Sequence, residues 1–263
     1  DSGVTLEGSV ATSIDEDSDG SVWITTERLG LLTFDPATGS LERYDNNTIP
    51  HFLTSVCACG DTLWVGAQNG LYRILLKNDD VRYFDRFENN GEQVNNRVLS
   101  IRTDSEGQLI VSLVGGMYLY DASSESFNKS GNSNCVNIMD FVDDGAGNLW
   151  MVSYTKGVYF YCRKDGNVKK YVRGKGNNEI GEMVSSPFLD ESGGVWMIGR
   201  NANIYKYDSL TDSFLTYHQI ALPNMQNCSL LSALQSSNGH FWITSTVGLF
   251  DFDPQKRSLN MYT

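Results

Sequence analysis

The sequence predicts an all-β fold assembled from six copies of one short unit, and three observations point to it. A tight turn followed by an apolar strand recurs as "GSVWIT", "DTLWVG", "GQLIVS", "GNLWMV", "GGVWMI" and "GHFWIT". The anchor positions of these copies lie 41, 46, 40, 46 and 46 residues apart, at Trp23, Trp64, Ile110, Trp150, Trp196 and Trp242. No segment shows the 3.6-residue period of an amphipathic helix. A repeat of this length is typical of one four-stranded blade, so we expect a β-propeller of six antiparallel blades.

The first two strands of each repeat are joined at a glycine. The first strand mixes apolar and polar residues, as in "VATSID" and "VLSIRTD", and the turn follows at Gly20, Gly107, Gly147, Gly193 and Gly239. A tight hairpin needs a positive φ, which glycine adopts without strain. The second strand is apolar at consecutive positions, as in "LWMV", which predicts burial on both of its faces. The second repeat departs from this pattern because Gly60 and Asp61 stand in the opposite order.

A second set of glycines introduces strands three and four. Gly30, Gly70, Gly116, Gly157 and Gly248 open segments such as "GLYRI" and "GMYLYD", whereas Asn203 takes this place in the fifth repeat. Alternating aromatic residues in these segments indicate a third strand. The fourth strand ends in an aromatic residue, as in "LERY" and "LNMY". Three repeats keep the same 21-residue distance from tryptophan to tyrosine: Trp23 to Tyr44, Trp150 to Tyr171 and Trp196 to Tyr217.

The repeated tryptophans are expected to be core residues. One sheet of four short strands cannot bury both of its faces alone, so neighbouring copies stack and the tryptophan fills the space between them. We predict a single propeller domain over residues 1–263, with blades at about 9–45, 52–85, 96–128, 135–172, 182–218 and 228–263. "GVTLE", residues 3–7, offers a further edge strand. The sequence leaves open whether the six repeats form a complete ring or a section of a larger propeller array.

Charge and composition exclude several classes of partner. The formal net charge is −12, with 20 lysines and arginines against 32 aspartates and glutamates. A nucleic acid or an anionic membrane surface binds proteins with the opposite balance, so neither is expected as a partner. No run of about 18 apolar residues occurs, and the start "DSGVTLEGSV" has no basic and apolar regions of a secretory signal. We therefore expect no direct membrane contact.

The cysteines suggest neither a disulfide framework nor a metal site. There are five, Cys57, Cys59, Cys135, Cys162 and Cys228, and an odd number leaves at least one thiol free unless it pairs with another chain. "CAC" places Cys57 and Cys59 on one face of a strand, but no second close pair or histidine cluster completes a zinc site. We expect all five to be small buried hydrophobes, and we expect no metal and no cofactor.

The repeat resembles a known motif. The pattern "D-x-x-G-x-L/V-W-I/M/V", present as Asp190, Gly193, Val195 and Trp196, is followed by "G-L/V-Y/L-x-Y/F-D", as in "GLFDFD" from Gly248. It resembles the two-component regulator propeller repeat, found in the periplasmic sensor regions of the hybrid histidine kinases with which Bacteroides-type bacteria detect complex glycans. The resemblance covers about residues 10–262, with departures at Ile110, at Asn203 and in the second hairpin.

The resemblance implies a function and partners. It implies the ligand-sensing periplasmic propeller of a hybrid two-component sensor histidine kinase, recognising an oligosaccharide or other small molecule and signalling to carbohydrate-utilisation genes. It also implies neighbouring propeller or β-sandwich domains in a longer parent chain, and a homodimeric parent. The fragment itself is not expected to be an enzyme, although its parent would resemble a kinase.

Candidate ligand-binding residues lie in the loops expected at one face. The loops between strands two and three gather there with the connections between blades, such as "DNNTIPHFLT" and "DRFENNGEQVNNR". Planar polar groups interleaved with aromatic rings suit the hydroxyl edges and C–H faces of sugars. The candidates are Glu27, Arg28, Gln68, Asn69, Arg97, Tyr154, Lys156, Arg200 and Asn201, with His51 and His218 in connections between blades. His240 falls in a hairpin turn on the other face, where we expect a structural role.

Recurring acidic residues in the turns indicate turn chemistry, because an aspartate in a hairpin accepts hydrogen bonds from its own backbone. No Ser-His-Asp order, phosphate-binding glycine loop or kinase motif is found. Two other functions stay open. The repeats are also similar to those of streptogramin-type lyases, so a lyase or glycan-cleaving enzyme could use His51, His218 and a nearby carboxylate. The second alternative is a scaffold that only joins neighbouring propellers.

Overall fold

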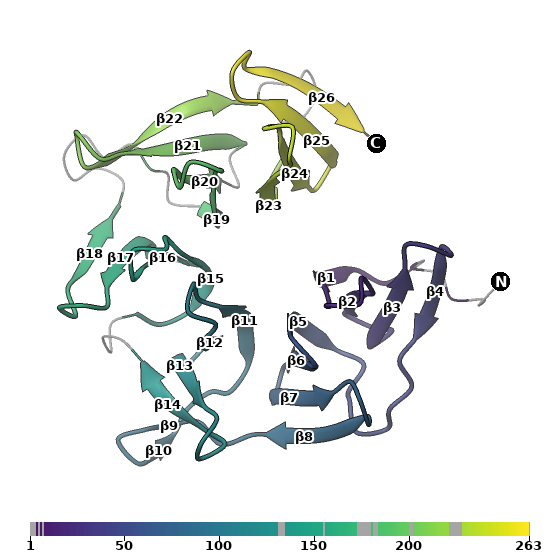
Figure 1. The fold of residues 1–263 in the computed structure, drawn as a ribbon. Coiled ribbons are helices and arrows are strands. Elements are labelled where there is room, and N and C mark those ends of the chain that lie inside the picture. Colours follow the sequence, from purple (N-terminus) through teal and green to yellow (C-terminus); the bar gives the residue numbers. More distant parts are fainter. Residues whose placement is uncertain are drawn as a thin grey trace. The chain divides into compact units, whose positions relative to one another are not determined.

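The regular structure consists of β-strands. The computed structural model describes residues 4, 6, 8–130, 135–154, 156–172, 180, 184–199, 202–220 and 228–262. Six four-stranded antiparallel sheets form there, each with its strands in chain order (Figure 1). The predicted all-β class and the predicted blades of four antiparallel strands are therefore confirmed. No helix of a length and apolarity that would cross a bilayer occurs in the described part of the chain.

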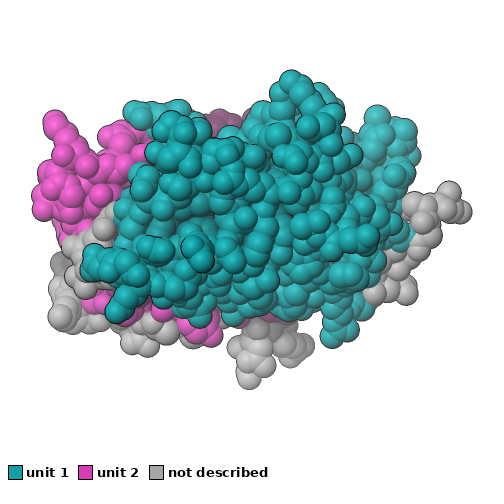
Figure 2. All heavy atoms as spheres, turned by 90° about the horizontal axis from the view of Figure 1, so that it is seen from below, with its two compact units in different colours: residues 1–130 teal, residues 131–263 magenta. Residues whose placement is uncertain are grey.

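The chain divides into two compact units, residues 1–130 and 131–263 (Figure 2). The single domain over residues 1–263 stays a prediction. The first unit holds three blades. They are β1 (Ala11–Glu16), β2 (Val22–Thr26), β3 (Leu31–Asp35) and β4 (Ser40–Arg43); β5 (Leu53–Cys59), β6 (Thr62–Ala67), β7 (Gly70–Leu75) and β8 (Asp80–Phe84); and β11 (Val98–Thr103), β12 (Leu109–Leu113), β13 (Gly116–Asp121) and β14 (Ser126–Ser130).

The second unit holds the other three blades. They are β15 (Ile138–Asp143), β16 (Asn148–Ser153), β17 (Gly157–Cys162) and β18 (Val168–Tyr171); β19 (Val184–Leu189), β20 (Val195–Gly199), β21 (Asn203–Asp208) and β22 (Ser213–Gln219); and β23 (Leu230–Gln235), β24 (Phe241–Ser245), β25 (Gly248–Asp253) and β26 (Ser258–Tyr262). In five blades the second strand follows the predicted turn glycine. In the second blade it follows Gly60 and Asp61.

The first hairpin turn is stabilised by its aspartate. Asp17 Oδ1 accepts hydrogen bonds from the main-chain N–H groups of Asp19 and Ser21, both at 3.0 Å. Gly20 completes the turn with a φ of 83°. The second carboxylate oxygen of Asp17 accepts a hydrogen bond of 2.7 Å from the indole Nε1 of Trp23. One carboxylate therefore closes the turn and orients the core tryptophan, as expected of an Asx turn.

The hydrogen bond from the tryptophan to the turn aspartate is also present in the fifth blade, and in the fourth blade a different donor takes its place. Asp190 Oδ2 accepts a hydrogen bond of 2.8 Å from the indole of Trp196. In the fourth blade Asp144 Oδ2 is bonded instead to the amide of Asn148, at 2.9 Å. The indole nitrogen of Trp150 is consequently buried without a hydrogen-bond partner among the described residues. A buried donor of this kind costs about 1–3 kcal/mol.

Four of the five tryptophans, all but Trp242, pack between their own blade and the next one of the same unit. The ring of Trp64 lies 4.7 Å from that of Tyr120 in the third blade, and Trp196 lies 4.9 Å from Phe241 in the sixth. Such aromatic pairs contribute about 0.5–1.5 kcal/mol beyond the area they bury. The predicted core role is confirmed for Trp23, Trp64, Trp150 and Trp196, which are at most 7% exposed, whereas Trp242 is half-buried.

A bulge near the start of every first strand was not predicted. In all six blades the register between strands one and two shifts at the same place, for instance between Ala11 and Ser13. A bulge turns a side chain out of the regular alternation. The Thr12 hydroxyl, at the bulge of the first blade, donates a hydrogen bond to the carbonyl of Leu53 in the second at 3.0 Å. The hydroxyl of Ser185, at the bulge of the fifth blade, donates a hydrogen bond to the carbonyl of Leu230 in the sixth blade.

Two details differ from the sequence-based expectations, and a third prediction is not tested. The connection after the second blade carries an extra hairpin, β9 (Glu88–Asn89) and β10 (Glu92–Gln93), that was not predicted. In the fifth blade Ala202, with a φ of 60°, adopts the left-handed conformation at the second turn. Asn203 already belongs to β21, so the strained position lies one residue earlier than the glycine pattern suggested. The proposed edge strand at residues 3–7 lies largely outside the described residues.

The prediction that all five cysteines are small buried hydrophobes is confirmed for three of them. All five are free, with Cys57, Cys135 and Cys228 buried and Cys59 and Cys162 half-buried. Burial, helped by Asp15 and Cys59, raises the pKa of Cys57 to about 12. Its thiol is therefore protonated at neutral pH and is a poor nucleophile.

Candidate functional site

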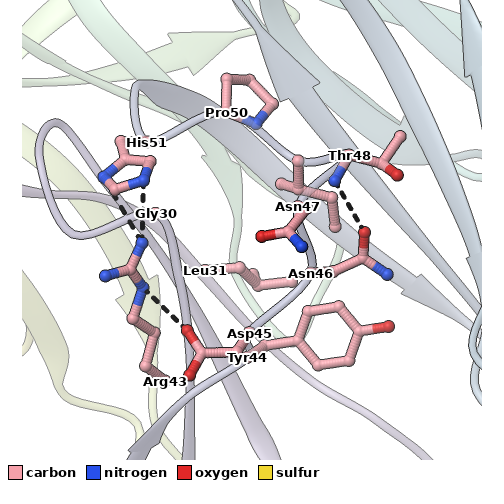
Figure 3. Close-up of a pocket in the computed structure, with 11 residues that line it drawn as sticks. Gly30, Leu31, Arg43, Tyr44, Asp45, Asn46, Asn47, Thr48, Pro50 and His51 are labelled. Atoms are coloured by element: carbon pink, nitrogen blue, oxygen red, sulfur yellow. Dashed lines mark hydrogen bonds and ion pairs between the residues drawn. The ribbon is translucent and has the colours of Figure 1, made fainter.

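A cavity of about 340 Å³ lies in the first unit, where the end of β4 meets the connection to the second blade (Figure 3). The connection itself supplies most of the lining. The lining residues are Gly30, Leu31, Arg43, Tyr44, Asp45, Asn46, Asn47, Thr48, Ile49, Pro50 and His51. Because polar side chains converge on this cavity, it is the candidate ligand site.

The connection is held in place at three points. Asn46 forms a turn, since its side-chain oxygen accepts a hydrogen bond from the N–H of Thr48 at 2.9 Å and its carbonyl accepts one from Ile49 at 3.1 Å. Ile49 is buried in the same core cluster as Leu31. The N–H of Gly30, in the turn between β2 and β3, donates to the carbonyl of His51 at 3.0 Å. Asx turns and buried anchors of this kind fix a loop that has no regular structure.

Arg43 stands between a histidine and a carboxylate (Figure 3). Its guanidinium Nη2 lies 2.9 Å from Nε2 of His51, and its Nε lies 3.4 Å from Oδ1 of Asp45. A guanidinium can only donate, so the imidazole nitrogen that it contacts is the unprotonated acceptor. The Arg43 side chain is 38% exposed and that of Asp45 is 84% exposed. An ion pair this exposed contributes about 0.2–1 kcal/mol, so removing it is expected to leave the fold intact.

Below the cavity Tyr44 provides a rigid support. Its ring packs edge-on against Trp23, with centroids 5.6 Å apart, and its hydroxyl donates a hydrogen bond of 3.1 Å to Asp79 of the second blade. Burial raises the pKa of Tyr44, and the carboxylate of Asp79 raises it further. The phenol therefore stays protonated at neutral pH and keeps its hydrogen bond.

The arrangement suits binding better than covalent chemistry. Arg43 offers donors, Asp45 offers acceptor oxygens, and the exposed amide of Asn47, which has no hydrogen-bond partner in the described part of the chain, offers both. The cavity lining contains no serine or cysteine, and the His51 ring contacts Arg43 rather than the hydroxyl of Thr48, the aliphatic hydroxyl of the lining. A ligand with several hydroxyl groups matches this mixture of donors and acceptors.

The other predicted site residues of the first unit lie in loops near the same ends of their sheets. Glu27 and Arg28 follow β2, and their N–H groups bond to the carbonyl of Val10 and the hydroxyl of Ser9. Of all the predicted site residues described, His51 is the one that lines the cavity.

Gln68 and Asn69 lie exposed between β6 and β7. The carbonyl of Asn69 accepts a hydrogen bond of 2.7 Å from the side chain of Asn96 in the following connection. Arg97, next in that connection, is exposed, and its carbonyl accepts a hydrogen bond from Val114 in the loop between β12 and β13. A ligand role for these residues stays a prediction.

In the second unit Tyr154 and Lys156 are exposed in the loop between β16 and β17, whereas Arg200 and Asn201 lie outside the described residues. Their ligand roles also stay predictions.

The expected location of His218 was wrong. It lies inside β22, paired with Ile204, because a bulge between Ile204 and Tyr205 lets that strand continue past Tyr217. The His218 ring packs on Phe252, with centroids 5.0 Å apart. Burial lowers the pKa of His218, and the nearby charge of Arg257 lowers it further.

Sequence reasoning missed Arg43. The residue belongs to β4, inside the segment "LERY", which was interpreted only as a fourth strand closing on an aromatic residue. The available signal was a charged residue immediately before the tyrosine that opens the polar connection. Asp45 and Asn47 lie within the connection that was expected on the ligand face, although they were not named individually.

A second cavity in the first unit, of about 640 Å³, lies between the second and third blades. Two of its charged groups, Arg73 and Glu125, are paired with each other, and Asp121 accepts hydrogen bonds from Ser123 and Ser124. Arg73 Nη1 donates to Glu125 at 2.9 Å and to the hydroxyl of Tyr120 at 3.2 Å, and Gln108 bonds to the carbonyl of Tyr120 at 2.7 Å. These contacts join two blades, so most charged groups of this cavity already have partners, although Nε of Arg73 is buried with none among the described residues.

No family model matches the chain, and a search of curated protein sequences found no match. Solved structures do match. The extracellular domain of a protein assigned to a hybrid two-component system of B. thetaiotaomicron superimposes with a TM-score of 0.77 at 17% identity, covering 95% of this chain and 34% of that one. The chain is an all-β propeller with six four-stranded blades. The predicted fold class is thus confirmed.

Two further structures resemble the propeller. The extracellular domain of a second B. thetaiotaomicron protein, described as a one-component system, matches with a TM-score of 0.67 at 16% identity over 97% of the propeller and 43% of that chain. A catalytically inactive virginiamycin B lyase from Staphylococcus aureus, solved with quinupristin, matches with a TM-score of 0.75 at 12% identity. The match covers 98% of this chain and 86% of the lyase chain. At these identities the likenesses show the fold alone. The propeller spans about a third of the length of the first structure.

Proposed function

We propose that the propeller is the ligand-sensing part of a periplasmic two-component sensor and that it recognises an oligosaccharide. The observation that carries the proposal is the cavity at Arg43, where a guanidinium, a carboxylate and a histidine ring surround a space next to the free amide of Asn47. Sugar hydroxyls donate and accept hydrogen bonds, and such a site satisfies both roles. The structural likeness to extracellular sensor domains supports the proposal at the level of the fold.

The signalling role follows from the same proposal. In a homodimeric sensor, a ligand shifts the equilibrium between two arrangements only if it binds one of them more tightly. The parent kinase would pass that bias across the membrane to carbohydrate-utilisation genes. Neighbouring propeller or β-sandwich domains of the parent would complete the sensor, because the propeller covers only part of the sensor structures that it resembles.

An enzyme is the second candidate, favoured by the likeness to the lyase. In the described part of the chain His51 is hydrogen-bonded to Arg43, and His218 packs on Phe252. A general base must reach the proton that it removes, and it is most effective when a carboxylate orients it. Neither ring forms such a carboxylate contact among the described residues. His240 does, with its Nδ1 2.6 Å from Oδ1 of Asp251, but it does not line the cavity, so a binding role there is the better-supported proposal.

A thermal-shift screen against plant and host oligosaccharides tests the proposal. A ligand that binds only the folded state raises the melting temperature, by an amount that grows with its concentration relative to Kd. Each hit is then incubated with the protein and examined for cleavage. An increase in melting temperature with the sugar intact is the expected result. Cleavage would favour the enzyme, and no shift with any sugar would contradict an oligosaccharide site in this chain.

A further inference from the structure

The turn between strands one and two places an aspartate at the same position in four blades. This position lies two residues after the residue that pairs with the anchor of the second strand, for example Asp190 after Phe188, the partner of Trp196. The residues there are, in chain order, Asp17, Cys59, Asp104, Asp144, Asp190 and Ser236. The second blade therefore has a cysteine where the first, third, fourth and fifth have a carboxylate.

In the fifth blade this carboxylate contacts a tryptophan and a lysine. Asp190 Oδ2 accepts the hydrogen bond of 2.8 Å from the indole of Trp196 and lies 3.8 Å from Nζ of Lys206. Lys206 pairs with Trp196 across the sheet, and its Nζ lies 4.6 Å from the centre of the indole ring. The aspartate side chain is only 12% exposed. The fifth blade thus shows which group binds beside a tryptophan and a cation of the third strand: a nearly buried carboxylate.

The second blade repeats the tryptophan and the cation without the carboxylate. Arg73 on the third strand pairs with Trp64, as Lys206 pairs with Trp196 in the fifth blade. The other four blades carry uncharged or acidic residues at the position of Arg73, namely Thr33, Leu119, Phe160 and Asp251. The second and fifth blades therefore share one arrangement of donors, and the turn of the fifth alone supplies the acid.

Cys59 is a poor substitute for the aspartate. Burial, followed by the carboxylate of Asp15, raises the pKa of its thiol, which is therefore uncharged at neutral pH. An uncharged thiol is only a weak hydrogen-bond acceptor. The indole Nε1 of Trp64 accordingly has no hydrogen-bond partner in the part of the chain that the structure describes.

The guanidinium of Arg73 is only partly used. Its Nη1 donates to Glu125 and to the hydroxyl of Tyr120, but its Nε is buried and has no hydrogen-bond partner among the described residues. The carboxylate of Glu125 is shared with Arg82, so a single acid serves two guanidinium groups. A guanidinium carries five N–H donors and can bind one carboxylate through two of them. Arg73 can therefore pair with a second carboxylate.

Cys59, Trp64 and Arg73 all line the cavity of about 640 Å³ between the second and third blades. Small-molecule sites usually have volumes of about 300–1,000 Å³. The carboxylate of Asp121 also lies in the lining, but it accepts hydrogen bonds from two serines of its own turn. Apolar side chains form another part of the wall, namely Leu75, Leu109 and Leu119.

We infer that this cavity is a second ligand site and that it binds a small monocarboxylic acid with an apolar body. The ligand carboxylate lies beside Trp64 and Arg73 as the carboxylate of Asp190 lies beside its partners in the fifth blade. Its oxygens accept hydrogen bonds from the indole and the guanidinium, and its apolar body packs on the leucines of the wall. The cavity shares no lining residue with the one at Arg43, so the inference does not rest on the proposed sugar-binding function.

Calorimetric titration with phenylacetate and with isovalerate tests the inference. The matched neutral ligands are phenylacetamide and isovaleramide, which have nearly the same shapes but no charge. At least one of the two acids is expected to bind about tenfold or more tightly than its amide, because charge-assisted hydrogen bonds are the stronger ones. The inference is overturned if neither acid binds at up to about 10 mM, or if acid and amide bind equally.

Two variants at Cys59 test where the acid binds. Cys59→Asp supplies the carboxylate from the chain itself, as in the fifth blade, and is expected to weaken binding of the acid about tenfold or more. Cys59→Ser, which is similar in size and uncharged, should bind the acid like the wild type. A cooperative thermal unfolding transition establishes that both variants are folded. Binding of the acid by Cys59→Asp with the affinity of the wild type would place the ligand elsewhere and overturn the inference.

Discussion

The hydroxyl of Tyr171 donates a hydrogen bond of 2.8 Å to the carboxylate of Asp212, which joins the fourth blade to the fifth. Tyr171 is only 1% exposed, and burial, followed by its contact with Tyr207, raises its pKa well above the usual range. The phenol therefore stays protonated at neutral pH and keeps its hydrogen bond. Asp212 also accepts a hydrogen bond from Tyr207 at 2.9 Å and forms an ion pair with Lys169.

Replacing Tyr171 by phenylalanine tests the value of this contact. The substitution keeps the ring and its packing but removes the hydroxyl, while Asp212 keeps its other partners. We expect the free energy of unfolding to fall by about 1–2 kcal/mol, measured by urea denaturation. Tyr161→Phe, at a half-buried tyrosine of the adjacent strand, should stay within about 0.5 kcal/mol of the wild type. Equal effects of the two substitutions would contradict the account.

Exchanging the residue types at two equivalent turns gives a second prediction. Asp212→Gly relieves a left-handed conformation but removes three interactions, so we expect a net loss of about 1 kcal/mol in the free energy of unfolding. Gly166→Asp introduces the strain without a partner, and we expect a loss of similar size. Opposite substitutions should therefore both destabilise the protein in denaturant titrations. A stabilised Asp212→Gly variant would show that the carboxylate contributes less than the strain costs.

The turn aspartate of the fifth blade predicts a pH dependence. Burial alone would raise the pKa of Asp190, but hydrogen bonds from Ser192, Trp196 and Gly194 outweigh it and lower the pKa below its usual value. A carboxylate with a lowered pKa in the folded state stabilises the protein above its unfolded pKa, and this contribution is lost as the pH falls through the folded pKa. In urea denaturation, the free energy of unfolding should fall less between pH 5 and pH 3 for Asp190→Asn than for the wild type. Parallel declines would refute this assignment.

His218 is expected to make the stability of the protein depend on pH in a higher pH range than Asp190 does. Its pKa is lowered, first by burial and then by Arg257, so the unfolded chain binds a proton more readily than the folded one. Its contribution is complete above the ordinary histidine pKa of about 6.5 and is lost as the pH falls towards the lowered value. The stability of the wild type should decline more steeply from pH 7.5 to pH 5 than that of His218→Gln. Identical slopes would mean that the ring is not protected from protonation.

Much of the fold could be predicted from the sequence because its main determinants are local. A glycine such as Gly20 is needed wherever the hairpin requires a positive φ, and an apolar second strand such as β6 is buried on both faces. These requirements recur in every repeat, so a periodic pattern exposes them.

Other features depend on contacts between distant residues. The bulge at Tyr217, which leaves His218 paired with Ile204, follows from the pairing of β22 with β21 and leaves no local pattern. The β9–β10 hairpin did have a local signal, Asn90 followed by Gly91, both with positive φ, but it lay inside a connection assumed to be irregular.

The candidate site was predictable only in part. The polar connection after the first blade indicated where ligand groups gather, and His51 was named. Arg43 was missed because its role depends on the folded connection, which brings His51 back to within 2.9 Å of a strand residue eight positions earlier. The pairing of loop and strand residues is a tertiary relationship that a repeat pattern does not encode.

Calorimetric titration of a sugar that raises the melting temperature into the wild type, Arg43→Ala and Lys164→Ala tests the central claim most directly. Lys164 is exposed in the turn between β17 and β18 and does not line the cavity, so its removal controls for the loss of one positive charge. If the cavity binds the sugar, Arg43→Ala should weaken binding about tenfold or more, and Lys164→Ala should bind like the wild type. Equal affinity of the wild type and Arg43→Ala would contradict a ligand site at this cavity.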